Sequence, residues 1–332
     1  MTLKHSVRAT LVTGGAGYIG SHVVRLLAQR GEQVVVLDDL SSGDLGRIPD
    51  VPFVYIDLAA PDALDAIERA LVDYRITSVM HFAARKQVGE SVAAPTSYFD
   101  CNVGGLTNLL AAMERAGVQE LVFSSSAAVY GEPEAATITE STPCVPVNPY
   151  GQSKLIGEWM THNAATAWGL RVANLRYFNV AGTGWPDLAD RVATNLVPIV
   201  INAALDGVAA RVFGTDWDTP DGSCVRDYIH VLDLAEAHLA ALDHLRRGGT
   251  ESVFNLGTGR GSSVLEVIRR VSECSGIDMQ VEASPMRPGD PASVVADPSR
   301  ANEVLGWRST RTLQDIVQTA WDAAAAQLIL VG

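Results

Sequence analysis

The stretch from Arg8 to Asp39 reads RATLVTGGAGYIGSHVVRLLAQRGEQVVVLDD and decides the fold of this chain. The apolar run 10–12 predicts a buried strand, and the glycine-rich turn Gly14–Gly20 follows it at once. Residues 21–31 have the apolar spacing of an amphipathic helix, and residues 34–37 predict a second buried strand. A strand, a glycine-rich turn, a helix and a second strand within about 30 residues are the context that a dinucleotide fingerprint requires.

The chemistry of this turn explains why a dinucleotide is expected there. Glycines at 14, 17 and 20 let backbone N–H groups approach a pyrophosphate, and the helix N-terminus adds partial positive charge. Asp38 ends the second strand, where a carboxylate can bond the ribose 2′-hydroxyl. Asp39 adds a second negative charge that would repel a 2′-phosphate, so the sequence predicts NAD rather than NADP. A glycine-rich turn that binds nothing would not explain the strand, the helix and the acid together.

The composition is that of a globular protein with a large core. The chain has 332 residues, of which 47% are hydrophobic and 19% charged, and its formal net charge is −13. This charge argues against nucleic acid and anionic membranes as partners. The four cysteines have no metal-ligand spacing, which predicts reduced thiols, no metal site and a cytoplasmic location. No apolar run reaches the about 18 residues of a membrane span, and the N-terminus is too polar for a signal peptide.

Strand-like and helical segments alternate through the first half of the chain. Strands are predicted at 53–56, 78–82, 120–125 and 171–176, and helices at 61–73, 95–116 and 149–168. This alternation predicts an α/β fold, a doubly wound parallel Rossmann sheet covered by helices on both faces.

After Asn179 the regular alternation ends. Loops are expected at 182–190, 215–222 and 285–291, helices at 195–205, 232–245 and 263–274, and short strands at 211–213, 226–229 and 253–256. We therefore expect an NAD-binding domain over 1–180, joined by parts of 226–257. A smaller, discontinuous α/β domain over 181–332 is expected to bind the substrate.

Tyr150 and Lys154 stand four residues apart at the start of the predicted helix 149–168, so they share one helical face. A nearby ammonium favours the phenolate, which would let the tyrosine act as a general base near neutral pH. The chain has 8 tyrosines but only three lysines. Chance would therefore give about 0.07 such Tyr-x-x-x-Lys pairs. The alternative for this pair is a solvated helix face.

Three serines, Ser124 to Ser126, close the predicted strand 120–125. A hydroxyl there could bond a substrate oxygen and share its proton with Tyr150. It could equally cap a turn or a helix, and the sequence favours neither role.

Taken together, these residues resemble the extended short-chain dehydrogenases/reductases. The glycine turn, the stretch SSAAVYG (125–131) and the Tyr150/Lys154 pair carry this resemblance. The stretches HFAARKQVGES (81–91), RYFNVAG (176–182) and VRDYIHV (225–231) narrow it to the UDP-glucose 4-epimerase family, over residues 8–322. The resemblance implies NAD-dependent inversion at C4 of a UDP-hexose through a transient 4-keto sugar. It assigns Tyr150 as the base, Ser126 as its assistant, and Lys154 as the residue that holds the nicotinamide ribose.

The resemblance also implies binding residues. Cofactor contacts fall on Gly14, Gly17, Tyr18, Ile19, Gly20, Asp38, Asp39, Leu40, Ser41, Ser42, Gly43, Asp57, Leu58, Phe82, Ala83, Ala84, Lys86, Asn102, Ser124, Tyr150, Lys154 and Phe178. Contacts to the UDP-sugar fall on Lys86, Ser126, Tyr150, Asn179, Asn195, Leu196, Val212, Phe213, Arg226, Tyr228, Arg287, Asp290 and Ser293. The two arginines suit a diphosphate, because a guanidinium binds phosphate oxygens in pairs. Asn102 could instead be a plain polar helix residue, Phe213 could pack in the core as readily as it stacks on uracil, and Asp290 could start a turn.

Two departures from the family pattern stand out. The loop between Asp38 and Asp57 is shorter than in many relatives, and Asp39 replaces a common asparagine. Ser293 falls where relatives restricted to glucose and galactose carry a tyrosine. A serine leaves room beside C2 of the sugar, which predicts that N-acetylated hexosamines are also accepted.

Two other functions compete with epimerisation. A sugar-nucleotide 4,6-dehydratase needs extra carboxyl groups at the end of the strand, and Ser124-Ser125-Ser126-Ala127 has none. A non-catalytic NAD-binding regulatory protein would not need Ser126, Tyr150 and Lys154 together. In relatives, helices matching 95–116 and 149–168 pair with their symmetry mates in a four-helix bundle, so a homodimer is expected.

Overall fold

The structure, a computed structural model, describes residues 8–135, 137–192, 195–250, 252–287 and 290–331. The chain divides into two compact units. The first comprises Met1–Val129, Asn148–Leu175 and His238–Val253, and the second comprises Tyr130–Val147, Arg176–Ala237 and Phe254–Gly332. The predicted domains of 1–180 and 181–332 include residues 1–7 and 332, which lie outside the described ranges. Compared with the predicted NAD-binding domain of 1–180, the first unit lacks 130–147 and 176–180. It also contains 238–253, which lies within the stretch 226–257 that was expected to contribute to that domain.

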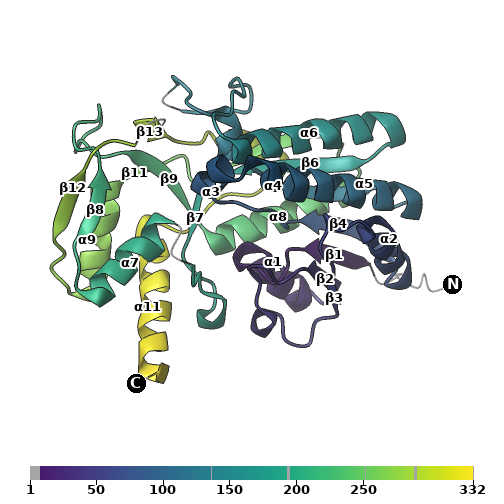
Figure 1. The fold of residues 1–332 in the computed structure, drawn as a ribbon, viewed down its shortest axis with the longest axis horizontal. Coiled ribbons are helices and arrows are strands. Elements are labelled where there is room, and N and C mark those ends of the chain that lie inside the picture. The colour runs from purple at the N-terminus through teal and green to yellow at the C-terminus, as the bar shows by residue number, and fades with distance from the viewer. Residues whose placement is uncertain (1–7, 136, 193–194, 251, 288–289, 332) are drawn as a thin grey trace. The chain divides into compact units, whose positions relative to one another are not determined.

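A seven-stranded sheet has the order β10-β6-β5-β4-β1-β2-β3 and lies mostly in the first unit; Figure 1 labels its strands β1 to β4 and β6. Its strands are β1 (Ala9–Thr13), β2 (Gln33–Asp38), β3 (Phe53–Tyr55), β4 (Ile76–His81), β5 (Glu120–Ser126), β6 (Arg171–Tyr177) and β10 (Ser252–Leu256). β1 pairs in parallel with both β2 and β4, so the order of the sheet reverses between β1 and β4. The predicted doubly wound α/β sheet is confirmed, and ligands of such sheets bind outside the carboxyl ends of the strands at this reversal.

Helices complete the first unit. They are α1 (Tyr18–Gln29), α2 (Ala63–Asp73), α3 (Val88–Ala93), α4 (Pro95–Phe99), α5 (Gly105–Ala116), α6 (Pro149–Trp168) and the part of α8 (Val231–Arg246) that follows Ala237. Side chains from α2, α5 and α6 share one core with the sheet, including Leu11, Ile67, Leu109 and Phe123. The prediction of one regular helix over 95–116 was wrong in its middle, where Asp100–Gly104 is a π-helical turn. Such turns widen a helix locally and re-aim its side chains.

The second unit is built around β9 (Val225–His230). β7 (Asn179–Ala181), β11 (Gly261–Ser263) and β13 (Ser293–Val294) pair with it, and β8 (Ala210–Phe213) forms a separate parallel pair with β12 (Val281–Ser284). α7 (Leu196–Asp206), α9 (Val264–Ser275) and α11 (Leu313–Val331) contribute to its core, and α10 (Ser299–Val304) precedes α11. The sequence did not predict β7, β11 or β13, because strands of two or three residues have too little periodicity to be recognised.

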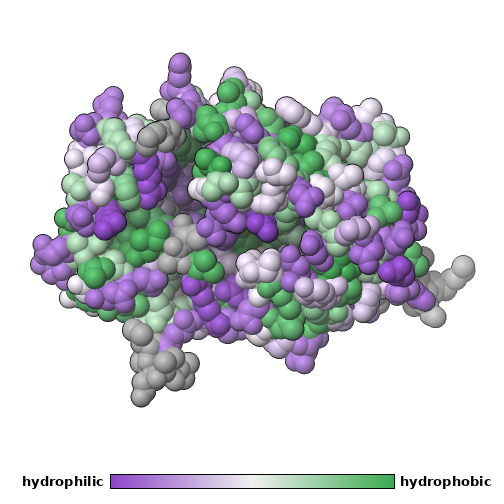
Figure 2. All heavy atoms as spheres, in the orientation of Figure 1, coloured by the Kyte–Doolittle hydropathy of each residue, from purple (hydrophilic) through white to green (hydrophobic). Residues whose placement is uncertain are grey.

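The surface of the first unit mixes polar and apolar side chains, as Figure 2 shows on one face. Its exposed apolar side chains include Val92 on α3, which is 63% exposed, and Trp159 on α6, which is 58% exposed. All four cysteines are free thiols. Within the described ranges, each helix is too short or too polar to cross a bilayer.

Candidate active site

The glycine turn between β1 and α1 is packed so closely that side chains would not fit. A Cβ on Gly14, whose φ is +69°, would lie 2.6 Å from the backbone nitrogen of Ala83, and one on Gly20 would lie 2.3 Å from the Gly14 oxygen. α1 begins at Tyr18 without a side-chain cap. The turn therefore presents bare backbone at an uncapped helix N-terminus, which fits a pyrophosphate.

Asp38, at the end of β2, ties the glycine turn to the next loop. Its Oδ2 accepts a hydrogen bond from the Ala16 N–H at 3.0 Å, and its Oδ1 accepts one from the Leu40 N–H at 2.8 Å. Burial raises the pKa of this carboxyl, while the two backbone bonds lower it. Asp39 accepts from the N–H and the hydroxyl of Ser41, so both acids shape the loop 38–43.

Helix α6 begins where the sequence predicted it, at Pro149. Asn148 caps it, because its Oδ1 accepts a hydrogen bond from the Gly151 N–H at 2.9 Å, and Pro149 fits the first helical position. This start places Tyr150 and Lys154 on consecutive turns of one face. The Lys154 Nζ lies 6.0 Å from the centre of the Tyr150 ring.

Lys154 is held by the end of β5. Its ammonium donates to the Ser124 carbonyl oxygen at 2.8 Å, and the side chain is almost fully buried. Burial lowers the pKa of Lys154 to about 8. The group is therefore largely charged at neutral pH but titrates far below an ordinary lysine.

Tyr150 on α6 and Ser126 at the end of β5 are hydrogen-bonded to each other through their side chains. Burial raises the pKa of the Tyr150 phenol, and its hydrogen bond with the Ser126 side chain lowers it. The Ser126 Oγ also accepts from the Ala128 N–H at 3.2 Å. The Ser126 hydroxyl thus makes the turn contact that the sequence left open, and its bond to a substrate oxygen stays a prediction.

His81, at the end of β4, lies near enough to Lys154 to feel its charge, and its ring is uncharged at neutral pH. Its Nδ1 lies 2.7 Å from the Thr13 hydroxyl, and its ring stacks on Phe123. Burial, and then the charge of Lys154, lower the pKa of His81 to about 3.

The side-chain amide of Asn102, in the π-helical turn, makes hydrogen bonds to two other segments of the first unit. Its Oδ1 accepts from the Arg85 N–H at 2.8 Å, and its Nδ2 donates to the Arg85 oxygen and to the Ser153 hydroxyl on α6. The amide thereby connects α6 to the segment that carries Lys86. The sequence had left open whether this residue contacts the cofactor or is a plain polar residue of a helix.

The remaining cofactor candidates of the first unit are dispersed along the strand ends. The ring centres of Phe82 and His238 lie 4.7 Å apart, with the two rings tilted by 38°. Leu58 is buried and Lys86 is exposed. The Asp57 carboxylate accepts a hydrogen bond from the Ala59 N–H. Phe178 lies in the second unit and is buried there.

In the second unit, the predicted UDP-sugar residues form two pairs. The Arg226 Nη1 donates to the carbonyl oxygens of Val225 and Pro291, each at 2.8 Å, and its Nη2 lies 3.8 Å from an Asp290 oxygen. The Arg287 guanidinium lies 3.7 Å from the centre of the Phe213 ring. Phe213 is therefore a partly exposed aromatic platform and not a fully buried core residue.

Other predicted residues of this unit have mixed surroundings. Asn179 is exposed in β7 opposite Tyr228 of β9, whose phenol has its pKa raised by burial. Asn195 precedes α7 and donates to Asp190, and Leu196 opens that helix. Val212 is 1% exposed, so its side chain belongs to the core. Ser293 is partly buried in β13, paired with Val225.

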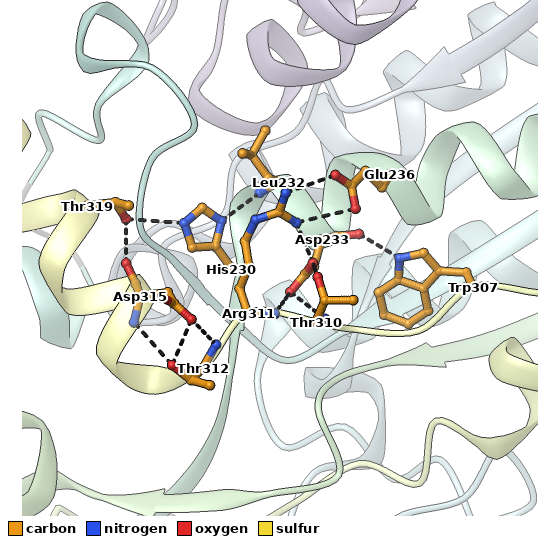
Figure 3. A network of polar contacts seen from close by, with 10 residues as sticks. All are labelled: His230, Leu232, Asp233, Glu236, Trp307, Thr310, Arg311, Thr312, Asp315 and Thr319. Atoms are coloured by element: carbon orange, nitrogen blue, oxygen red, sulfur yellow. Dashed lines mark hydrogen bonds and ion pairs between the residues drawn. The ribbon is translucent and has the colours of Figure 1, made fainter.

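A cavity of about 540 Å³ in the second unit adjoins Tyr228, the first turns of α9 and residues 309–314. Its Arg311 is bound by Asp233 and Glu236 at 2.5 and 3.1 Å (Figure 3). Asp233 also accepts from Thr310, so this network connects the start of α8 to the segment before α11 (Figure 3). Arg270 is paired with Glu273 at 2.9 Å. Two of the three arginines that line the cavity, Arg270 and Arg311, are therefore already paired with carboxylates, and the third is Arg260.

Comparison with known proteins agrees with this geometry. The model of the "NAD dependent epimerase/dehydratase family" matches residues 10–257. A UDP-glucose 4-epimerase of Azospirillum brasilense is 48% identical over 96% of this chain and 93% of its own. A crystal structure of UDP-glucose-4-epimerase from Stenotrophomonas maltophila, with bound NAD and formylated UDP-arabinopyranose, has a TM-score of 0.92 and 40% identity, and covers 97% of this chain and 99% of that one.

A UDP-Glc/GlcNAc 4-epimerase from Campylobacter jejuni has a TM-score of 0.84 and 36% identity, covering 96% and 99% of the two chains. The matches span nearly the whole chain at identities well above 30%. They confirm the predicted resemblance and the predicted NAD dependence. The chain therefore belongs to the NAD-dependent epimerase/dehydratase family, among its UDP-glucose 4-epimerases, which are isomerases.

Proposed function

We propose that the protein inverts C4 of UDP-hexoses, interconverting UDP-glucose and UDP-galactose through a transient 4-keto sugar. The observation that carries this proposal is the hydrogen bond between Tyr150 and Ser126 with Lys154 one helical turn away. The same unit carries the bare glycine turn and Asp38, which fit a dinucleotide.

Each side chain has a defined task in this scheme. Tyr150 takes the proton of the sugar 4-hydroxyl and later returns one, and Ser126 shares that proton through its bond to the phenol. Lys154 favours the phenolate by its charge and bonds the nicotinamide ribose. NAD, held by the glycine turn and Asp38, supplies the hydride acceptor and donor for C4 when it is bound.

The second unit is proposed to bind the nucleotide part of the substrate. Arg226 is held by two carbonyl oxygens, so its guanidinium is already ordered for a diphosphate oxygen. The partly exposed Phe213 ring supports stacking on uracil, and Arg287, whose guanidinium lies over that ring, would bind the phosphates. Asn179, Asn195 and the other predicted contacts complete the proposed assignment.

Product analysis tests the proposal directly. Purified protein is incubated anaerobically with UDP-galactose, and the nucleotides are separated by chromatography. An epimerase gives UDP-glucose with no net NADH. A stable 4-keto product would indicate a 4,6-dehydratase, and unchanged UDP-galactose a non-catalytic NAD-binding protein.

We further propose that UDP-GlcNAc and UDP-GalNAc are substrates. The support is the small side chain of Ser293, where glucose-restricted relatives are expected to carry a tyrosine. The test is the ratio of turnover of UDP-GlcNAc to that of UDP-glucose, in the natural protein and in Ser293→Tyr. The proposal fails if the substitution leaves this ratio unchanged.

We propose a homodimer through helices of the first unit. Val92 and Trp159 leave large apolar side chains exposed on α3 and α6, and these two helices contact each other within the unit. Apolar surface of this kind is often covered by a second copy.

A further inference from the structure

Helix α6 meets the end of β5 at three successive turns. Tyr150 bonds the Ser126 hydroxyl, Lys154 donates to the Ser124 carbonyl oxygen, and the Ser125 hydroxyl donates to the Glu158 Oε1 at 2.5 Å. Residues 150, 154 and 158 are four apart, so they form one stripe along the helix. Each of the three serines is therefore held by a different turn of α6.

The contact between Ser125 and Glu158 is buried inside the protein. Ser125 is fully buried and Glu158 is 6% exposed. A buried carboxylate is unfavourable unless its hydrogen bonds are made. Glu158 has no assigned part in the chemistry, and the sequence did not single it out, although its spacing from Lys154 could have done so.

Helix and strand approach each other closely at this point. A Cβ on Gly157 would lie 2.5 Å from the Cζ of Phe123, so only glycine lets α6 come this near to β5. Thr161, on the next turn, lies 3.0 Å from the Asn174 Oδ1 on β6. The helix is thus fixed along its length by packing and by buried polar contacts.

We propose that Glu158 is a positioning residue, which through Ser125 fixes the register of residues 124–126 against α6 and so places the Ser126 hydroxyl on the Tyr150 phenol. The proposal rests on the proposed function, because it assigns Glu158 to that same site. A hydrogen bond between two hydroxyls is lost when their oxygen atoms lie more than about 3 Å apart. This limit is shorter than the rise of about 3.3 Å from one strand residue to the next, so the strand need not slip by a whole residue to break the bond. A shift of about 1 Å at the strand end would therefore separate the pair.

Three variants test this proposal. Glu158→Gln keeps an acceptor for Ser125, Glu158→Met has similar length and no acceptor, and Ser125→Ala removes the donor. Glu303→Met, at an exposed position of α10, is the matched control. Glu158→Met and Ser125→Ala should each lower kcat about tenfold or more with KM for UDP-galactose within about twofold, since ground-state binding is untouched. Glu158→Gln should stay within about threefold of the natural protein. The double variant Ser125→Ala/Glu158→Met should be no worse than either single one.

A titration independent of turnover gives the second readout. The absorbance of tyrosine phenolates is recorded from neutral to alkaline pH for each protein. Subtracting the curve of Tyr150→Phe removes the other tyrosines and leaves the titration of Tyr150, whose midpoint is compared between variants. Weakening the Ser126 bond should raise the Tyr150 midpoint by about 0.5–1 pH unit in Glu158→Met and Ser125→Ala. The titratable groups beside Tyr150 and its neighbour Lys154 are Lys154 itself on α6, His81 on β4 and Cys101 in the π-helical turn, and none of these is altered.

The outcomes separate the two proposals. If the natural protein fails to convert UDP-galactose, the proposed function is wrong, and the Tyr150 titration alone decides the role of Glu158. If it converts UDP-galactose and Glu158→Met matches it in kcat and midpoint, the positioning role is wrong. Should Glu158→Met not fold, Ser125→Ala decides, and an unchanged midpoint there overturns the proposal. Loss of activity in Glu158→Gln to the level of Glu158→Met would overturn it as well.

Discussion

Replacing Tyr150 with phenylalanine removes one hydroxyl and should remove most of the activity. The phenol is the proposed proton acceptor, and the other titratable ring at this sheet edge, His81, has its pKa lowered to about 3. His81 binds its proton too weakly to serve as a substitute acid, and it is buried against Thr13. General-base catalysis typically contributes about 10²–10⁴-fold, so kcat should fall by that factor, or about 2.7–5.4 kcal/mol in activation free energy.

The same substitution should hardly affect folding. Tyr150 is partly exposed, and the Ser126 hydroxyl keeps its bond from the Ala128 N–H. The free energy of unfolding should therefore change by less than about 1 kcal/mol. NAD content should also remain, because the glycine turn and Asp38 are untouched.

The assay follows conversion of UDP-galactose to UDP-glucose by chromatography, together with NAD content and thermal unfolding. Tyr55→Phe is the control, since the Tyr55 side chain on β3 is 67% exposed. It should match the natural protein in all three measurements. A Tyr150→Phe protein that retains more than about a tenth of the natural kcat would refute the role of the phenol as base.

Four further predictions concern charge, cofactor choice and assembly. Because burial lowers the pKa of Lys154 to about 8, kcat should fall as the ammonium is lost above that pH, and Lys154→Arg, which stays protonated, should remove this alkaline limb from the pH profile. Because the pKa of Lys154 is lowered in the folded protein, the unfolded chain binds more protons than the folded one between about pH 8 and pH 10.5. The contribution of Lys154 to the free energy of unfolding should therefore rise with pH in that window. Urea denaturation would show this rise, and it should be absent in Lys154→Met. Asp38→Ala removes the acceptor of the Ala16 and Leu40 N–H groups and one of the two charges that repel a 2′-phosphate. NAD should therefore bind at least about tenfold more weakly, and the preference of the protein for NAD over NADP should narrow, as fluorescence titration of the apoprotein would reveal. Trp159→Glu should convert a dimer to a monomer in light scattering without loss of NAD, and an unchanged mass would exclude this face of α6 as the interface.

Periodicity in the sequence was sufficient for the long elements. The predicted helix 149–168 has the bounds of α6, and the predicted strands at 53–56, 78–82, 120–125 and 171–176 each overlap β3 to β6 within two residues. These segments bury a continuous apolar face, so local pattern and final packing agree. Short strands escaped prediction because hydrogen bonds to distant residues define them. The π-helical turn at Asp100–Gly104 escaped because one widened turn leaves the helical pattern of the sequence unchanged.

The sequence by itself determined the chemistry: a bare glycine turn followed by an acid, and a tyrosine four residues before a lysine on a capped helix. Both are local, since they depend only on residues within one or two turns of the chain. Tertiary structure alone decided the titration of these groups and their partners. Burial sets the pKa of Lys154 near 8, and Ser125 meets Glu158, and Ser126 meets Tyr150, only because α6 packs on β5. Desolvation and register arise from contacts between segments far apart in the chain, which no local pattern encodes.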